Sequence, residues 1–221
     1  MWYSNTPGYS WSVRKGVSER FKTEVRLIRD RFSTKKLRVG RETSTTRVNV
    51  RTRVGPVDVI VREFNWDLVE RHSDYNLPVF EFDILVFARK GDLKRLDNFE
   101  DSQGLSFLGQ LKKFFPTEGP KNRPVRKRFI NEDVVFKGKF RLEFPVEYPL
   151  EPPLVRMDDY DYRRISDYHG HHIFSGGVLC IFAGHGDWSG SRSTALTALL
   201  VTIDWLAWHY AKFGEDFLGH E

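Results

Sequence analysis

A cluster of prolines directly after an alternating segment limits the folds available to this chain more than any other feature. Between Val134 and Pro145, apolar side chains fall on alternate positions, and the six residues from Tyr148 to Pro153 then include three prolines. A period of two is typical of a half-buried strand, whereas proline lacks the backbone donor that a ladder needs. The sequence therefore predicts a strand that runs into a rigid bend.

A second periodic segment lies near the start of the chain, over residues 18–32. Its apolar residues recur at spacings of four, three and four, and Ser18 precedes them as a possible N-cap. This pattern predicts an amphipathic basic helix with two sets of residues on opposite faces: Phe21, Val25, Ile28 and Phe32 inward, and Arg20, Lys22, Arg26 and Arg29 outward.

Three further segments are typical of β structure and a fourth of a helix. Val48 to Val54 alternates with polar residues and predicts a strand ending at Gly55-Pro56, with residues 57–64 as its hairpin partner. Residues 78–88 are almost continuously apolar, which favours a central strand. A long helix is expected from about Ser193 to Phe213, a short helix is a possibility at 105–115, and residues 1–17 are expected to form an arm.

Composition excludes several classes of protein. The longest apolar run, Ala195 to Trp208, is interrupted by polar residues, and no charged-then-apolar leader opens the chain, so we expect neither membrane insertion nor secretion. Cytoplasmic localisation is the expectation. The 221 residues contain one cysteine, Cys180, so an internal disulfide is impossible. That thiol is either a small buried apolar group or chemically used.

Charge is concentrated at the front of the chain. Residues 1–60 hold fourteen Lys and Arg against five Asp and Glu, although the whole chain carries a net charge of only +5. A basic front of this kind suits nucleic acid, an acidic lipid surface or an acidic protein, and it is also compatible with a plain solvated face. Charge alone does not choose among these.

The proline bend belongs to a longer pattern that resembles one enzyme family. A strand with a Phe-Pro, Tyr-Pro, Pro-Pro sequence, a glycine three residues before a cysteine, and a tryptophan eight residues after it precede a long helix in the ubiquitin-conjugating enzymes. The matching residues here are Phe144-Pro145, Tyr148-Pro149, Pro152-Pro153, Gly177, Cys180 and Trp188.

This resemblance, which covers residues 134–213, implies a fold and a domain plan. The implied fold is α+β and UBC-like: an N-terminal helix, an antiparallel meander of four or more strands, and a long helix after the cysteine. One domain would span residues 18–221 and carry an insertion within about residues 35–130. The chain ends at Glu221 without the two further helices of many eukaryotic members, as in bacterial members.

The resemblance also implies an activity and its partners. In this family the cysteine accepts the C-terminus of a ubiquitin-like protein as a thioester and passes it to a protein amine. The partners would be a ubiquitin-like modifier, an adenylating (activating) enzyme and an acceptor protein. The bacterial relatives act in antiviral defence systems that include a metallopeptidase. No cofactor and no membrane partner are expected.

The candidate catalytic residues are Cys180 and the histidines near it. The family places a His-Pro-Asn triplet before its cysteine, and this chain has Gly170, His171 and His172 there. Transfer needs a donor for the oxyanion and a group that takes the amine proton. The His172 ring could fill either role, since it donates an N–H and titrates near neutrality.

Other histidines and the residues beyond the cysteine have weaker claims. His171, His169 and His185 are the reserve candidates for donor or base. Alternatively, each has only a structural role and stabilises a polar loop through hydrogen bonds. Trp188 is expected to pack beneath the catalytic loop rather than to touch substrate. Where the family often has an acidic residue near the end of the long helix, this chain has Lys212, followed by Glu215 and Asp216.

Three alternatives to the transferase remain open. The first is a non-catalytic module that keeps the fold to bind a ubiquitin-like partner. The second is a basic nucleic-acid-binding protein that uses residues 1–60 and 112–128, although no base-reading motif supports it and nucleic acid is not the expected partner. The third is a zinc site, for which the ligands would be His169, His171, His172, Cys180 and His185.

Overall fold

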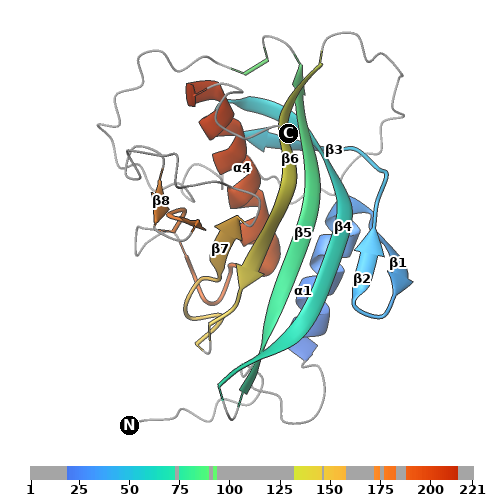
Figure 1. Ribbon diagram of the computed structural model, residues 1–221, viewed down its shortest axis with the longest axis vertical. Helices are drawn as coiled ribbons and strands as arrows, with labels where there is room; N and C mark the ends of the chain where they lie inside the picture. The colour runs from blue at the N-terminus through green and yellow to red at the C-terminus, as the bar shows by residue number, and fades with distance from the viewer. Residues whose placement is uncertain are drawn as a thin grey trace.

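The protein has an α+β fold in which two helices accompany a large antiparallel sheet. The computed structural model describes residues 19–72, 75–89, 92–93, 132–145, 147–157, 172–174, 177–182 and 188–213, with side chains omitted at 67–72, 75–77 and 132. Among them, helix α1 spans Glu19–Phe32 and helix α4 spans Ala195–Phe213. Figure 1 shows both helices on the same side of the curved sheet.

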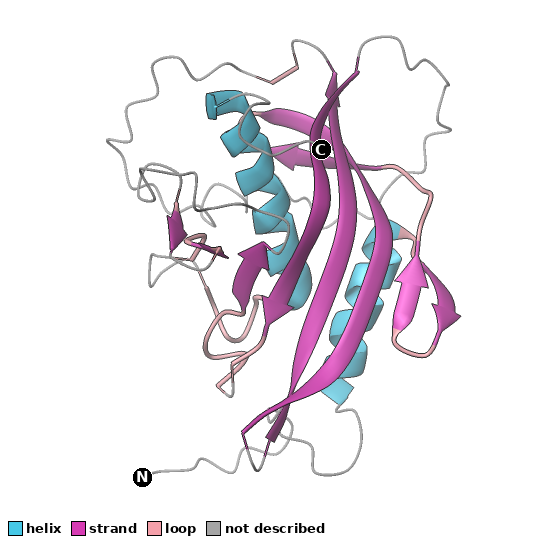
Figure 2. Ribbon diagram, viewed as in Figure 1, coloured by secondary structure: helices cyan, strands magenta, loops and turns pink. Residues whose placement is uncertain are grey.

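The sheet has nine strands in the described part of the chain, and every pairing is antiparallel. The strand order is β1-β2-β4-β5-β6-β7-β9-β8, and β3 pairs separately with β4. Figure 2 shows the three long strands β4, β5 and β6 running side by side through its centre. The strands are β1 Lys35–Arg38, β2 Arg41–Thr43, β3 Val48–Thr52, β4 Gly55–His72, β5 Tyr75–Arg89, β6 Glu132–Glu143, β7 Leu154–Met157, β8 Ile173–Phe174 and β9 Val178–Leu179.

Phenylalanines on the three long strands form the centre of the core. Phe64, Phe82 and Phe140 lie directly opposite one another across β4, β5 and β6. Their rings stack in turn, with centroid distances of 4.8 Å for Phe64–Phe82 and 5.2 Å for Phe82–Phe140. From α1, Phe21 packs edge-on against Phe80 of β5, at 5.4 Å. Such cross-strand aromatic pairs stabilise a sheet beyond their simple burial.

Several predicted elements are confirmed, with shifted ends. Helix α1 ends at Phe32 as expected, and β5 lies between β4 and β6, which confirms the central strand. The strand expected to end at Gly55-Pro56 in fact ends at Thr52, and Gly55 begins its partner β4. The reason is the turn itself: Gly55 has a φ of +147°, and a Cβ on it would lie 2.4 Å from the Asp92 carbonyl oxygen.

The structure adds strands that the pattern did not reveal and leaves some predictions outside its described part. Strands β1, β2, β7, β8 and β9 were not predicted, and β4 extends eight residues past the expected end at Phe64. The arm 1–17, the helix 105–115 and the loop 116–128 lie outside the described residues. No helix in the described ranges combines the length and apolar character needed to cross a bilayer.

Candidate active site

The proline bend after β6 is anchored from within the core. Phe144 and Tyr148 are both buried, and their rings meet edge-to-face at 4.8 Å. The Tyr148 hydroxyl donates to Oε1 of Glu24 on α1, at 2.7 Å. Because a tyrosine hydroxyl inside a core needs a partner, this bond fixes the bend against the first helix.

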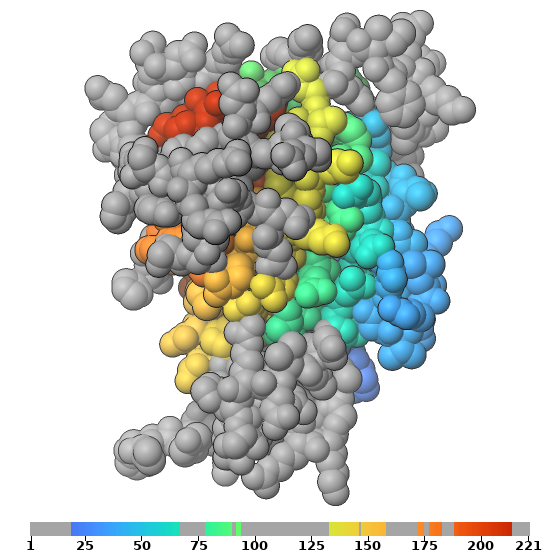
Figure 3. Space-filling view, in the orientation of Figure 1, coloured from blue at the N-terminus to red at the C-terminus, as the bar shows by residue number. Residues whose placement is uncertain are grey.

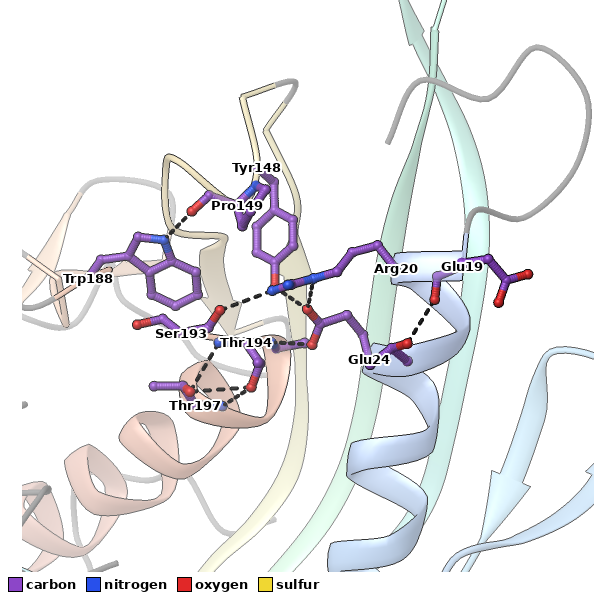
Figure 4. Close-up of polar contacts among 11 residues, drawn as sticks. Glu19, Arg20, Glu24, Tyr148, Pro149, Trp188, Ser193, Thr194 and Thr197 are labelled. Carbon is purple, nitrogen blue, oxygen red and sulfur yellow. Dashed lines mark hydrogen bonds and ion pairs between the residues drawn. The ribbon is translucent and has the colours of Figure 1, made fainter. Parts of the chain in front are cut away.

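Glu24 joins three elements that are far apart in sequence, as Figure 4 shows. Besides Tyr148, it accepts a hydrogen bond from Arg20 Nε at 2.6 Å on Oε1 and from the Ala195 backbone N–H at 2.8 Å on Oε2. Arg20 in turn donates to the Ser193 carbonyl at 3.1 Å. Burial raises the pKa of the fully enclosed Glu24 carboxyl, and these donors oppose that rise. The carboxylate therefore ties α1, the bend and the start of α4 together.

The start of α4 is capped by its own residues as well. The Thr194 hydroxyl accepts from the Thr197 N–H at 3.2 Å, while the Thr197 hydroxyl accepts from the Thr194 N–H at 3.1 Å. This reciprocal pair has the geometry of a capping box, with threonine in place of the usual acid. It explains why the helix begins at Ala195, two residues after the predicted start.

Trp188, which precedes α4, binds to the proline bend through a hydrogen bond and ring contacts. Its indole N–H donates to the Pro149 carbonyl at 2.7 Å, and its ring packs against Tyr148 at 5.9 Å and Phe182 at 5.2 Å. Gly190 lies so close to the bend that an added Cβ would sit 2.9 Å from the Pro149 oxygen. Trp188 therefore packs inward against the bend and Phe182, while residues 183–187 between Phe182 and Trp188 lie outside the described part of the chain.

Cys180 follows immediately after the short strand β9. That strand is held on β7, where the Met157 N–H donates to the Gly177 carbonyl at 3.0 Å, and on β8 through Ile173 and Leu179. Gly177 enters the strand with a φ of +75°, a left-handed conformation that glycine adopts without a Cβ penalty. The cysteine thus stands at the end of a tight antiparallel hairpin at the edge of the sheet.

His172 is the one predicted histidine that falls within the described residues, and its backbone contacts that of Cys180. The Cys180 N–H donates to the His172 carbonyl at 2.7 Å, so the two residues are joined through their backbones. His172 has a φ of +55°, and its ring contacts Trp208 of α4 edge-to-face at 5.3 Å. A left-handed conformation is unfavourable for a residue with a Cβ and is characteristic of functional positions.

The thiol of Cys180 is half-buried and is free, not part of a disulfide. Burial raises the pKa of this thiol, which keeps most of it protonated at neutral pH. The thiolate is the nucleophilic form, so reactivity at this site depends on transient deprotonation.

A second group of buried charge lies on α4, behind His172, and sequence reasoning missed it. Asp204 is fully buried, accepts the Arg53 N–H at 2.7 Å and forms an ion pair with Arg53 Nε at 2.9 Å. The Arg53 guanidinium lies 5.1 Å and the Lys212 ammonium 4.9 Å from the centre of the Trp208 ring. Burial raises the pKa of Asp204 to about 6, although Arg53 opposes the rise. The sequence signal that could have indicated this group was Asp204 itself, an acid within an otherwise largely apolar helix.

The remaining predicted site residues are not part of the described structure. His171, His169 and His185 lie outside the described residues, as do the acids after Lys212. Within the described ranges, no three His, Cys, Asp or Glu side chains gather as they would to hold a metal ion. The zinc alternative depends largely on residues outside those ranges.

Comparisons with protein-family models, curated proteins and solved structures found no match. The resemblance to ubiquitin-conjugating enzymes accordingly depends on the motif residues of this chain alone.

Proposed function

We propose that this protein is a ubiquitin-conjugating-type transferase that carries a ubiquitin-like modifier as a thioester on Cys180. The observation that carries the proposal is that the segment around Cys180 and Trp188 is held against the proline bend and the strand that follows it. Trp188 donates to Pro149 within the proline bend, and β9, which ends beside Cys180, pairs with the strand that leaves the same bend. These contacts between the bend and the cysteine segment would keep a catalytic loop in a fixed position.

The proposed reaction has two balanced steps. The Cys180 thiolate attacks the thioester carbonyl on the activating enzyme; a new C–S bond forms, the old C–S bond breaks, and the activating enzyme's thiolate leaves. An acceptor amine then attacks the carbonyl on Cys180, so that a C–N bond forms and the Cys180 thiolate departs. A base takes the amine proton, and the earlier step, in which the modifier's carboxylate is adenylated by ATP with release of pyrophosphate, drives the sequence.

His172 is the residue proposed to assist the second step. Its carbonyl already holds the Cys180 N–H, and its backbone conformation is one that structures maintain at a cost. A ring N–H would stabilise the developing oxyanion, or the neutral ring would accept the amine proton. His171 and His185 are kept as reserve candidates for the same roles.

The partners follow from the reaction. The protein would work with an adenylating enzyme, a ubiquitin-like modifier and an acceptor protein, in the cytoplasm and without a cofactor. Its likeness in motif to bacterial relatives extends the proposal to an antiviral conjugation system with an associated metallopeptidase.

The decisive experiment is a loading assay with the cognate activating enzyme, the modifier and ATP. We expect an adduct on the wild-type chain that thiol reductants remove, no adduct on Cys180→Ala, and a reductant-resistant ester on Cys180→Ser. Absence of the adduct with an activating enzyme that charges itself normally would exclude the transferase.

A second candidate is a non-catalytic module that binds a ubiquitin-like partner. The observation that favours it is the burial of Cys180, which raises the pKa of the thiol and lowers its reactivity at neutral pH. The same assay separates the two candidates, because a binding module would retain the modifier non-covalently in both the wild type and Cys180→Ala.

A further inference from the structure

The β1–β2 hairpin exposes an edge of the sheet where apolar side chains lie beside cations that have no ion-pair partner in the described part of the chain. All four residues of β1 are exposed, including Leu37 at 59%, and Val39 in the adjoining turn is 88% exposed. In Figure 3 the hairpin stands out at the right-hand side of the visible face, in lighter blue. This edge therefore offers two exposed apolar side chains next to its cations.

The hairpin is held rigidly rather than loosely attached. The Trp66 N–H donates to the Gly40 carbonyl at 2.9 Å, and an added Cβ on Gly40 would lie 3.0 Å from the Trp66 carbonyl oxygen. Arg41 forms an ion pair with Glu63 of β4. A partner would therefore meet a preformed edge and lose less conformational entropy on binding.

The cations of β1 differ from three arginines on neighbouring elements. Those three guanidinium groups form ion pairs: Arg29 with Glu42, Arg41 with Glu63 and Arg62 with Asp83. By contrast, Lys35, Lys36 and Arg38 form no ion pair with any other described residue and are all exposed. The last strand in the sheet order thus carries three exposed cations with no anionic partner among the described residues.

We propose that β1 is a docking edge for an extended acidic segment of a partner protein, which adds to the sheet as a further strand. An edge strand offers backbone donors and acceptors to an extended chain, and opposite charge selects the chain that approaches. The same cations repel a second copy of β1 and so oppose self-association. Because a bulge at Leu37 interrupts the register, the added strand would be short, opposite Lys35–Arg38.

Backbone pairing is what distinguishes this occupant from the other polyanions that a basic surface attracts. A nucleic acid or an anionic bilayer would use the charges of β1, but neither would satisfy its backbone groups. This inference does not depend on the proposed transfer activity, since it concerns a different edge of the sheet from the one that holds Cys180.

The test uses the full chain and a labelled eight-residue peptide of alternating glutamate and valine. We expect saturable binding by fluorescence anisotropy, with slower amide hydrogen exchange across residues 35–39. A peptide with proline in place of valine keeps the charge but loses the four valine N–H donors and cannot form a regular added strand, and it should bind at least about tenfold more weakly.

Matched variants of the chain assign the binding to β1. The triple variant K35E/K36E/R38E should weaken peptide binding by about tenfold or more, whereas Arg51→Glu, which reverses an exposed cation on β3, should leave it nearly unchanged. Equal loss in both variants, equal binding of the proline peptide, or no peptide binding would overturn the proposal. It would also be overturned if a DNA duplex or phosphatidylserine vesicles bound β1 and displaced the peptide without protecting its amides.

Discussion

The hydroxyl of Tyr148 donates a hydrogen bond to Oε1 of Glu24 across 124 positions of sequence, at 2.7 Å. The bond joins the bend that precedes the cysteine segment to the first helix. Since Glu24 also receives the N–H of Ala195 at the start of α4, the two helices and the bend share one buried carboxylate. A substitution that removes this carboxylate should therefore destabilise the contacts among all three elements.

Removing Glu24 should be one of the most destabilising changes in the protein. Glu24→Ala leaves the Arg20 cation, the Tyr148 hydroxyl and the Ala195 N–H without their common acceptor, for which we expect a loss of about 3–5 kcal/mol in the free energy of unfolding. Tyr148→Phe removes only one donor and should cost about 1–3 kcal/mol. Chemical denaturation monitored by circular dichroism measures both.

Glu19 provides the control on the same helix. Its ion pair with Lys22 is fully at the surface, with Glu19 86% exposed, so Glu19→Ala should change stability by no more than about 0.5 kcal/mol. A cost for Glu24→Ala as small as that for Glu19→Ala would mean that the buried carboxylate does not hold the elements together.

The single thiol makes its titration directly measurable. Because burial raises the pKa of Cys180, the rate of its alkylation by iodoacetamide should still be rising above pH ~8.5, where an ordinary thiol is half ionised. Mass spectrometry of the modified chain gives the rate at each pH. An inflection near or below pH 7 would contradict the assigned environment and indicate an activated thiolate.

Much of the central fold could be predicted because its signals are local. Helix α1 and strands β3 and β6 carry apolar residues at regular periods, β5 is almost continuously apolar, β4 was expected as the hairpin partner of β3, and the structure confirms all of them. Strand β2 was not predicted because its one buried side chain is Glu42, a charge whose burial is stabilised by Arg29 and by the Thr34 hydroxyl. Strands β8 and β9 are two residues each, too short for any period.

In the candidate site, too, some residues could be predicted from the sequence and others could not. The spacing of Cys180 and Trp188 from the proline bend was readable, and the structure joins Trp188 to that bend. Glu24 was not found because an acid in an arginine-rich helix resembles a surface residue. Its burial depends on Tyr148 and Ala195, more than a hundred positions away, and no local pattern contains that information.

Asp204 should make stability fall as the pH rises through the mildly acidic range. Its folded-state pKa is raised from 3.8 to about 6, so the folded protein binds a proton that the unfolded chain has already released. Its contribution is complete below pH ~4 and is lost by pH ~6, which corresponds to roughly 3 kcal/mol. Asp204→Asn cannot titrate, and urea midpoints measured from pH 4 to 7 should show this loss in the wild type but not in the variant. A wild-type profile parallel to that of the variant would contradict the assigned pKa.

His172 allows stability and the proposed chemistry to be separated. In His172→Gly the left-handed backbone is relieved while the ring contact with Trp208 is lost, so we expect the free energy of unfolding to change by less than about 1 kcal/mol. Loading of Cys180 should persist, because the attacking sulfur and its backbone bond remain. Discharge to an amine should slow by about 10²-fold, since a donor to the oxyanion is missing.

His172→Asn decides what the ring contributes to that discharge. Asparagine tolerates the left-handed conformation and restores an amide donor, but it cannot accept a proton. Recovery of single-turnover discharge in His172→Asn would assign His172 to the oxyanion, whereas failure to recover, with a pH dependence near neutrality in the wild type alone, would assign it as the base. Loss of loading and discharge in equal measure would instead mean that the substitutions distort the loop, and the proposed role of His172 would be wrong.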